Sequence, residues 1–214
     1  MMRLKREDLR LYAVTDRRWL GEKTLKEAVK EALKGGATFI QLREKNMDSD
    51  EILKEAFEIK ELCGMYGAPF VINDDVDMAL ACDADGVHVG QKDMEASEAR
   101  KRLGSGKIIG VSVRTVEQAA AAEAAGADYL GVGAVFSTGS KADAERITKE
   151  TLRDICSAAD IPVIAIGGVN SENVKGLAGT GVCGAAVISA IFGADDIKKA
   201  AGELAAGIDE MLKK

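Results

Sequence analysis

The chain has 214 residues, 47% of them hydrophobic, so it is long enough to bury the core of a single barrel domain. Its formal net charge is −6 and both signs are spread along the sequence, which excludes the clustered basic face of a nucleic-acid-binding protein. The basic start, MMRLKRED, is not followed by an uninterrupted apolar segment, and no run approaches the ~20 apolar residues that span a bilayer. We therefore expect a soluble, cytoplasmic protein whose partners are small molecules rather than nucleic acid or membrane.

Short apolar runs alternate with helical patterns eight times along the chain, without a Pro/Ser-rich linker between them. Apolar residues at helical spacing predict amphipathic helices over Leu25–Leu33, Ile52–Cys63 and Ile197–Met211. Glycines at 35–36, 126 and 181 stand before predicted strands, where they permit the left-handed backbone of a helix C-cap. The predicted strands are Leu11–Thr15, Thr38–Arg43, Phe70–Asn73, Gly86–Val89, Ile108–Ser112, Tyr129–Ala134, Val163–Ile166 and Gly184–Ile188.

Eight βα units of this size predict an α/β fold, a closed (β/α)8 or TIM barrel, that occupies residues 1–214 as one domain. The alternative is an open doubly wound sheet, which would concentrate its polar residues at one switch point. Polar residues follow most of the predicted strands in this chain, which favours closure. In a closed barrel the carboxyl ends of all strands face the same mouth, so these polar residues can form one site.

Three polar residues, Gln41, Arg43 and Lys45, are spaced by two at the end of the second predicted strand. Because a strand alternates its faces with period two, we expect all three side chains to point the same way at the rim. The planar guanidinium of Arg43 suits phosphate oxygens, and Lys45 adds a mobile positive charge. The alternative is that Glu44 and Lys45 are surface charges at the solvated start of a helix.

Carboxylates follow the third predicted strand, at Asp74, Asp75 and Asp77, and the fourth, at Asp93. Carboxylates on neighbouring strand ends can converge on a hard cation, and Mg²⁺ takes one or two of them together with water and substrate phosphates. The alternative is that these residues cap the helix predicted from Val76 to Cys82. Both interpretations can hold together, with Asp75 at the helix cap and Asp74 at the mouth.

The single histidine, His88, lies inside a short apolar strand, where we expect a buried, hydrogen-bonded role in preference to direct catalysis. One histidine also excludes a histidine-rich metal site. The four cysteines, Cys63, Cys82, Cys156 and Cys183, lie far apart without the paired spacing of a zinc site or a disulfide framework. We expect them to be reduced, buried thiols.

A hydroxyl-rich loop, GAVFSTGSKAD at 133–143, follows the sixth predicted strand. Its hydroxyls, its glycine and an ammonium group can cradle a phosphate. Barrels often bind phosphate in the loops after strands seven and eight, where this chain has Gly167-Gly168 and Ser189. We therefore expect two anion sites, one lined by Arg43, Lys45 and Lys141 and the other by Gly168 and Ser189.

Six segments, taken in order, resemble the thiamine phosphate synthase family. They read GGATFIQLREK, PFVINDDVDMAL, ADGVHVGQKDM, GVSVRTVEQA, GADYLGVGAVFSTGSKADA and PVIAIGGV, and they cover nearly the whole chain. No single segment is decisive, but the ordered set is specific. The resemblance implies a (β/α)8 transferase that joins hydroxymethylpyrimidine pyrophosphate to thiazole phosphate, releases pyrophosphate, gives thiamine phosphate and uses Mg²⁺.

The resemblance also implies roles for individual residues. Gln41, Arg43, Lys45 and Asn73 match family residues around the pyrimidine and its pyrophosphate, and Asp74 and Asp93 match the aspartates that bind magnesium. Ser112 and Lys141 match residues near the pyrophosphate, so the implied catalytic groups are Arg43, Lys45, Ser112 and Lys141. The positions that hold the thiazole phosphate match Thr138, Ser140, Gly168, Ile188 and Ser189.

The chain departs from the family pattern at two places. The family usually has proline where Ser137 stands and two threonines in that loop, so Gly139 and Ser140 predict a looser phosphate cradle. Many members carry histidine where this chain has Arg114. A non-synthase relative, a thiazole tautomerase, uses a histidine at that position, so Arg114 argues against the tautomerase.

The residues and the resemblance point to the same chemistry. Pyrophosphate leaves from a benzylic-type carbon, the aminopyrimidine stabilises the resulting cation and the thiazole nitrogen captures it, so charge neutralisation matters more than a general base. Two alternatives stay open: a phosphosugar isomerase-type barrel without a metal, and a non-catalytic barrel that senses thiamine intermediates. The sequence also leaves the oligomeric state open, with a homo-oligomer as one alternative.

Overall fold

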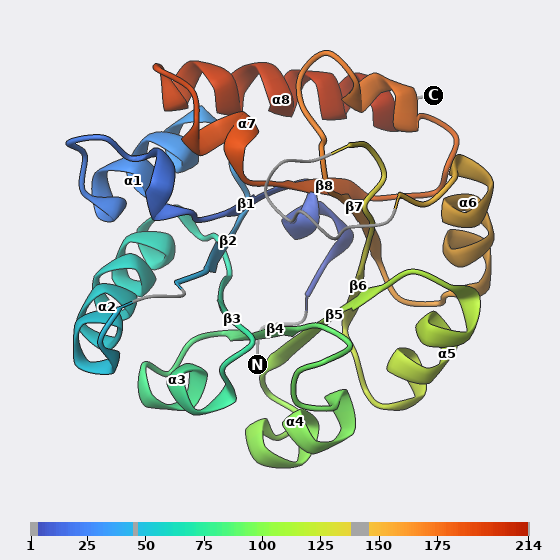
Figure 1. Ribbon diagram of the computed structural model, residues 1–214, viewed down its shortest axis with the longest axis horizontal. Helices are drawn as coiled ribbons and strands as arrows, with labels where there is room; N and C mark the ends of the chain where they lie inside the picture. The colour runs from blue at the N-terminus through green and yellow to red at the C-terminus, as the bar shows by residue number, and fades with distance from the viewer. Residues whose placement is uncertain (1–3, 45–46, 138–145, 214) are drawn as a thin grey trace.

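The computed structural model describes residues 4–44, 47–137 and 146–213. Within these residues eight parallel strands pair in chain order, and β8 pairs back to β1, so the sheet is a closed barrel (Figure 1). The predicted TIM barrel is confirmed. The strands are β1 (Leu11–Val14), β2 (Phe39–Leu42), β3 (Phe70–Asn73), β4 (Gly86–Val89), β5 (Ile108–Val113), β6 (Tyr129–Val132), β7 (Val163–Ile166) and β8 (Gly184–Val187).

Helices surround the strands on the outside of the barrel, as Figure 1 shows. They are α1 (Leu25–Gly35), α2 (Ser49–Tyr66), α3 (Val76–Ala81), α4 (Ala96–Leu103), α5 (Val116–Ala124), α6 (Lys149–Ala158), α7 (Ser189–Phe192) and α8 (Ile197–Leu212). Three 3-10 turns complete the described elements: η1 (Arg6–Leu9), η2 (Arg17–Trp19) and η3 (Val174–Leu177). None of the helices in the described part of the chain combines the length and the apolar character that crossing a bilayer requires.

The helix α1 shows how local sequence sets an element. Thr24 and Glu27 form a capping box at its start, and Gly36, with φ of 110°, ends it in the left-handed conformation. The apolar stripe from Leu25 to Leu33 is buried, as its spacing predicted. This stripe packs α1 against the barrel and against its neighbours α2 and α8.

The seventh βα unit differs from the prediction, because the described chain between β7 and β8 forms only the 3-10 turn η3 and no α-helix. Asn170 and Asn173 hydrogen-bond to backbone groups in the turn before η3. Three glycines follow within eight residues, at 176, 179 and 181, and glycine is a weak helix former. At this place in the ring of helices, α8 packs against η3.

The barrel interior has its own cluster of side chains, separate from the layer between strands and helices. Along β2, Phe39 faces this interior, whereas Ile40 and Leu42 face the helices. Tyr12 of β1 and Tyr129 of β6 are fully buried beside Phe39, with ring centroids 4.4 Å and 5.7 Å from its ring. At the amino end of the barrel, Leu9 of η1 joins the same cluster. The inside is therefore a packed core and not a pore, and barrels of this kind carry their active sites at the carboxyl end of the strands.

The four cysteines are free, as predicted, with Cys63, Cys82 and Cys183 buried and Cys156 partly buried. Burial raises the pKa of Cys63 to about 12 and the pKa values of Cys156 and Cys183 to about 11. Burial also raises the pKa of Cys82. All four are therefore protonated thiols at neutral pH.

Candidate active site

Polar side chains follow or end five consecutive strands at the carboxyl end of the barrel. Because the strands are parallel and closed into one barrel, these ends meet at a single mouth. The residues are Thr15 and Asp16 after β1, Arg43 after β2, Asn73 and Asp74 at the end of β3, Gln91 and Asp93 after β4, and Ser112 near the end of β5.

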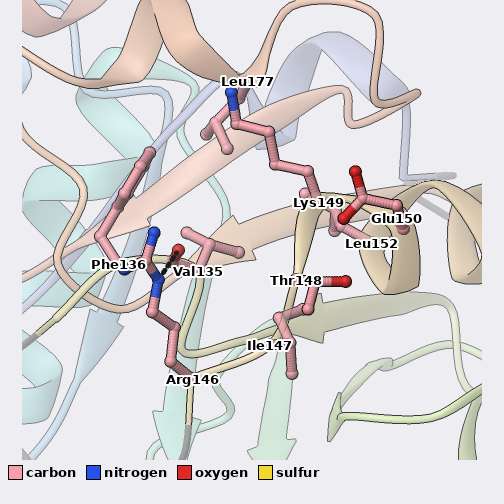
Figure 2. Close-up of a pocket in the computed structure, with 9 residues that line it drawn as sticks. All are labelled: Val135, Phe136, Arg146, Ile147, Thr148, Lys149, Glu150, Leu152 and Leu177. Atoms are coloured by element: carbon pink, nitrogen blue, oxygen red, sulfur yellow. Dashed lines mark hydrogen bonds between the residues drawn. The ribbon is translucent and has the colours of Figure 1, made fainter.

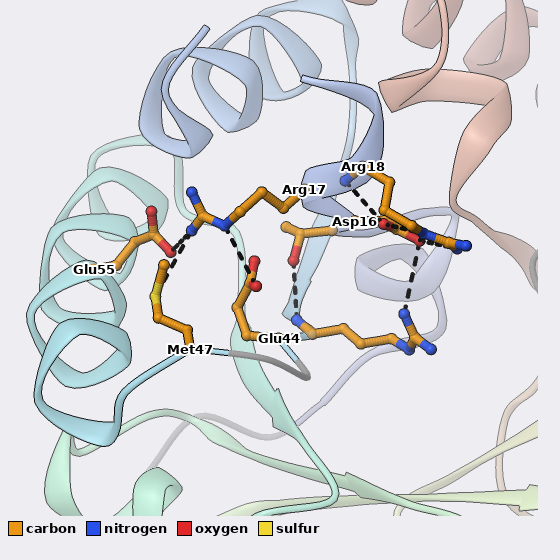
Figure 3. A network of polar contacts seen from close by, with 8 residues as sticks. Asp16, Arg17, Arg18, Glu44, Met47 and Glu55 are labelled. Carbon is orange, nitrogen blue, oxygen red and sulfur yellow. Dashed lines mark hydrogen bonds and ion pairs between the residues drawn. The ribbon is translucent and has the colours of Figure 1, made fainter. Parts of the chain in front are cut away.

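Asp16 is a buried carboxylate that lies next to two guanidinium groups. Its side chain is 4% exposed and pairs with Arg18 through contacts of 2.5 Å to Nη2 and 2.9 Å to Nε (Figure 3). Arg43 Nη1 lies 3.7 Å from the same Oδ2, and the Arg43 side chain is only 10% exposed. The hydrogen bonds from Arg18 hold the pKa of Asp16 below its usual value. The carboxylate therefore stays charged and orients both cations at the mouth.

A second ion network fixes the start of the β2–α2 connection. Arg17 Nη2 lies 2.5 Å from Glu55 Oε2, and its Nε lies 3.4 Å from Glu44 Oε2 (Figure 3). The Glu44 side chain is 7% exposed, so the alternative in which Glu44 is a surface charge is wrong. Burial raises the pKa of Glu44, and its Oε1 finds no hydrogen-bond partner in the described structure. The network holds the residue that directly follows Arg43.

Gln41 lies deeper than the rim position expected from sequence, because its side chain is buried at 4% exposure inside the barrel. Its Nε2 donates to the Tyr12 hydroxyl at 2.6 Å, and that hydroxyl lies 2.8 Å from the Tyr129 hydroxyl. The Tyr129 hydroxyl lies 2.9 Å from His88 Nδ1, and His88 Nε2 lies 2.8 Å from Ser112 Oγ. The expected buried, hydrogen-bonded state of His88 is confirmed.

Two carboxylates, Asp74 and Asp93, stand at the ends of the adjacent strands β3 and β4. Asp74 has φ of 63°, a left-handed conformation that is uncommon for a residue other than glycine, and its backbone N–H donates to the His88 carbonyl at 2.8 Å. Asn73 Nδ2 donates to Asp74 Oδ2 at 2.6 Å, and the Gly90 N–H donates to Asp93 Oδ2 at 2.8 Å. Both carboxylates are thus oriented by neighbouring donors.

The next residue, Asp75, caps α3 as one of the two interpretations predicted. Its Oδ1 accepts a hydrogen bond from the Met78 N–H at 2.8 Å. Capping therefore uses Asp75 and leaves Asp74 exposed at the end of β3.

The donor set at the mouth fits Mg²⁺. Over residues 4–44, 47–137 and 146–213, no three or more His, Cys, Asp or Glu side chains gather into a group that could hold a metal by itself. Mg²⁺ does not need such a cage, because it is commonly bound by one or two carboxylates and completes its shell with water and substrate phosphates. Asp74 and Asp93 follow the adjacent strands β3 and β4, so they are two carboxylates that could hold such an ion.

The ends of β7 and β8 carry Gly168, Ile188 and Ser189. Gly168 has φ of 68°, and a Cβ there would lie 2.3 Å from the Ser137 carbonyl, so the glycine allows the β6–α6 connection to approach β7 closely. Ser189 is exposed as the first residue of the short helix α7, with Ile188 directly before it. Four other predicted site residues, Lys45, Thr138, Ser140 and Lys141, lie outside the described residues, as does Gly139.

A family model described as thiamine monophosphate synthase matches residues 11–191. The chain belongs to the thiamine monophosphate synthase family. The resemblance expected from the ordered sequence segments is therefore confirmed.

Individual members of the thiamine monophosphate synthase family are similar to the chain over nearly its whole length. The thiamine-phosphate synthase of Clostridium tetani is 50% identical over 209 residues, which cover 98% of this chain and 100% of that protein. The thiamine-phosphate synthase of Ruminiclostridium cellulolyticum is 49% identical, covering 92% of this chain and 94% of that protein. A solved structure, the thiamine phosphate pyrophosphorylase from Pyrococcus furiosus, superposes with a TM-score of 0.89 at 46% identity, covering 97% of this chain and 98% of that one.

A pocket of about 390 Å³ lies between the β6–α6 connection, the start of α6 and η3 (Figure 2). Arg146 and Lys149 line it, and Arg146 Nε donates to the Val135 carbonyl at 3.3 Å. None of the described residues that match the functional positions of the thiamine monophosphate synthase family lines this pocket. We therefore assign the candidate site to the strand ends of the mouth.

Several residues of the mouth and of its floor were missed by the sequence analysis. Asp16 follows β1 as Asp74 follows β3, so the same strand-end signal was available for it. Tyr12 and Tyr129 gave no such signal, because strands buried on both faces do not reveal which residues point into the barrel. Contact between them joins positions 117 residues apart.

Proposed function

We propose that the protein condenses 4-amino-2-methyl-5-hydroxymethylpyrimidine pyrophosphate with 4-methyl-5-(2-hydroxyethyl)thiazole phosphate, giving thiamine phosphate and pyrophosphate. The observation that carries this proposal is the mouth itself, where Arg43, Asp74, Asp93 and Ser112 stand on successive strand ends in a chain of this family. Cations and carboxylates at one end of a closed barrel suit a reaction whose leaving group is highly anionic.

The departing pyrophosphate needs positive charge that is fixed before the bond breaks. Arg43 offers a planar fork for phosphate oxygens, and its contact with the buried Asp16 supports a fixed position. Lys45 and Lys141 are proposed to add charge to the same group, and Ser112 to donate a hydrogen bond to it. After departure the electron-rich aminopyrimidine stabilises the cation, and the thiazole nitrogen captures it.

Asp74 and Asp93 would hold Mg²⁺, which would add positive charge at the pyrophosphate when bound. The chain's own residues prepare that position, because Asn73 and the Gly90 N–H each orient one carboxylate. We further propose that Asn73 and Gln41 contact the pyrimidine. The residues proposed to hold the thiazole phosphate are Thr138, Ser140, Gly168, Ile188 and Ser189.

A pyrophosphate-release assay with both substrates, with and without Mg²⁺, tests the proposed function. Release that requires both substrates and falls after chelation of the metal is the expected result. Tight binding of either substrate without release would instead favour a sensor of thiamine intermediates. Activity on a sugar phosphate that does not depend on magnesium would favour an isomerase.

A further inference from the structure

Five side chains form a continuous series of hydrogen bonds across the floor of the mouth, called here the relay. It runs from Gln41 through Tyr12, Tyr129 and His88 to Ser112, with successive distances of 2.6, 2.8, 2.9 and 2.8 Å. The relay thereby links strand β2, which ends beside Arg43, to strand β5 on another side of the barrel.

The barrel is shaped to accommodate this chain. A Cβ at Gly110 of β5 would lie 2.1 Å from Tyr129 Cζ, and a Cβ at Gly131 of β6 would lie 3.1 Å from His88 Cε1. Neither glycine has a positive φ, so they are needed for space and not for backbone conformation. Any larger residue at Gly110 would displace the Tyr129 ring from the relay.

The protons along the chain are coupled because each buried hydroxyl carries only one. Tyr12 and Tyr129 are 1% and 0% exposed, and burial holds the pKa of each well above its ordinary value, so both stay protonated. If Gln41 Nε2 donates to Tyr12, then Tyr12 donates to Tyr129 and Tyr129 donates to His88 Nδ1. His88 then carries its proton on Nε2 and donates it to Ser112 Oγ. The hydroxyl proton of Ser112 is left for another acceptor.

Hydrogen bonds that run in the opposite direction, from Ser112 to Gln41, require the Gln41 side-chain amide to be flipped. If Ser112 donated to His88 Nε2, every bond would reverse, and the Tyr12 proton would need the Gln41 carbonyl oxygen as its acceptor. Gln41 would then have to turn its amide over and present its NH2 group elsewhere. The amide of Gln41 and the hydroxyl of Ser112 therefore change roles together.

We infer that this relay is a positioning device that presents the Gln41 carbonyl oxygen as an acceptor and the Ser112 hydroxyl as a donor in the same state. The inference rests on the proposed function, since a substrate with an amine at one end and a pyrophosphate at the other fits that pair of groups. Tyr12, Tyr129 and His88 act through the residues at the two ends of the relay, so they are positioning residues.

Nitrogen NMR of the full chain without ligands tests the relay directly, because His88 is the single histidine in the sequence. We expect one neutral tautomer with the proton on Nε2. Tyr129→Phe removes the hydroxyl and keeps the ring, so His88 should then populate both neutral tautomers. A proton on Nδ1 in the unmodified protein, protons on both nitrogens, or no change in Tyr129→Phe would each overturn the inference.

Kinetics give a second readout in the same variants. Tyr129→Phe should lower kcat for pyrophosphate release about ten-fold with little change in KM, as expected for a hydrogen bond that matters most at the transition state. Tyr66→Phe is the matched control, because it removes the hydroxyl of a 42% exposed tyrosine on α2 and should change neither tautomer nor rate. A Tyr129→Phe enzyme with unchanged kcat would also overturn the inference. Absence of pyrophosphate release in the unmodified protein would reject the proposed function and leave the tautomer result standing.

Discussion

At the scale of single residues, the mouth depends on charges that are held in place by other charges. Asp16 is nearly inaccessible to solvent, so its charge is tolerated because Arg18 and Arg43 pair with it. Asp16 orients Arg43, but the fold should tolerate loss of the Arg43 side chain. Arg18 would still pair with the Asp16 carboxylate through Nε and Nη2.

Replacing Arg43 with alanine should lower kcat/KM for pyrophosphate release by about two orders of magnitude, because a fixed cation at the leaving group is lost. Circular dichroism should show an intact fold, since Asp16 remains paired. Lys30→Ala removes an exposed cation from α1 and serves as the control, with unchanged kinetics expected. Near-normal turnover in Arg43→Ala would remove Arg43 from the mechanism.

Replacing Asp93 with asparagine should raise the Mg²⁺ concentration needed for half-maximal activity, because one charged ligand is lost. The amide oxygen can still accept the bond from the Gly90 N–H, so the β4–α4 connection should keep its conformation. Glu95→Gln neutralises an exposed carboxylate two residues away and should leave the magnesium titration unchanged. An unchanged titration in Asp93→Asn would count against its role as a ligand.

At the scale of elements, the hydrophobic pattern predicted most of the structure. The predicted bounds of β3, β4 and β7 match the structure to the residue, because each is an apolar run with clear polar or turn residues at its ends. β6 was predicted to reach Ala134 but ends at Val132. A Cβ at Gly133 would lie 2.0 Å from the Ile166 carbonyl, and this close approach of two backbones is not visible in an apolar sequence.

The candidate site could be predicted only in part, for a related reason. The strand-end rule found Arg43, Asp74 and Asp93, because a polar residue within a few positions of a strand end is a local signal. It could not find the contact of Tyr12 with Tyr129, nor the depth of Gln41, because both depend on packing across the closed barrel. Local patterns report strand ends well and the filling of the interior poorly.

Ion pairs between connections at the amino end of the barrel supply a pH-dependent prediction at this scale. Asp83, in the turn between α3 and β4, bonds Lys107 at 2.5 Å and Lys60 of α2 at 2.7 Å. The bond from Lys107, followed by that from Lys60, lowers the pKa of Asp83 to about 2. A lowered folded-state pKa gives stability that is complete above the unfolded pKa, near 4, and is lost as the pH falls toward 2.

Asp83→Asn should therefore lower the free energy of unfolding at pH 7 by at most about 1 kcal/mol, because the carboxylate is largely exposed. Asparagine tolerates the left-handed φ of 51° at this position, so the backbone should not be strained. The difference from the unmodified protein, measured by urea unfolding, should shrink between pH 4 and about pH 2.5. A difference that stays constant with pH would mean that the charge is not its cause.

At the scale of the whole molecule, closure joins the first and last βα units. β8 pairs with β1, and α8 packs against α1 so tightly that a Cβ at Gly35 would lie 2.4 Å from the Lys198 carbonyl and 2.6 Å from Ala201 Cβ. We propose that residues 1–214 unfold as a single domain. Every strand of a closed barrel has two neighbours, so no strand can leave without breaking two ladders.

Gly35→Ala should destabilise the whole barrel by about 1–3 kcal/mol, because the added methyl group forces α1 and α8 apart. The urea midpoint should fall with an unchanged m-value, in one transition that is the same by circular dichroism and fluorescence. Gly64→Ala is the control, because beyond its chain neighbours and the adjacent backbone of α2 this glycine has no atom within 4 Å of its Cβ position. Gly64→Ala should stabilise the protein by about 0.5–1 kcal/mol. Equal effects of the two substitutions would contradict the close packing of α1 against α8 at Gly35.

The four protonated thiols have a consequence for chemical probing. Alkylating reagents such as iodoacetamide attack the thiolate, so the folded protein should react slowly and an opened segment quickly. The thiols belong to different parts of the ring: Cys63 lies in α2, Cys82 at the end of α3, Cys156 in α6 and Cys183 just before β8. Mass spectrometry of pulse-labelled peptides would then measure how fast each of these four parts of the barrel opens, without any engineered label.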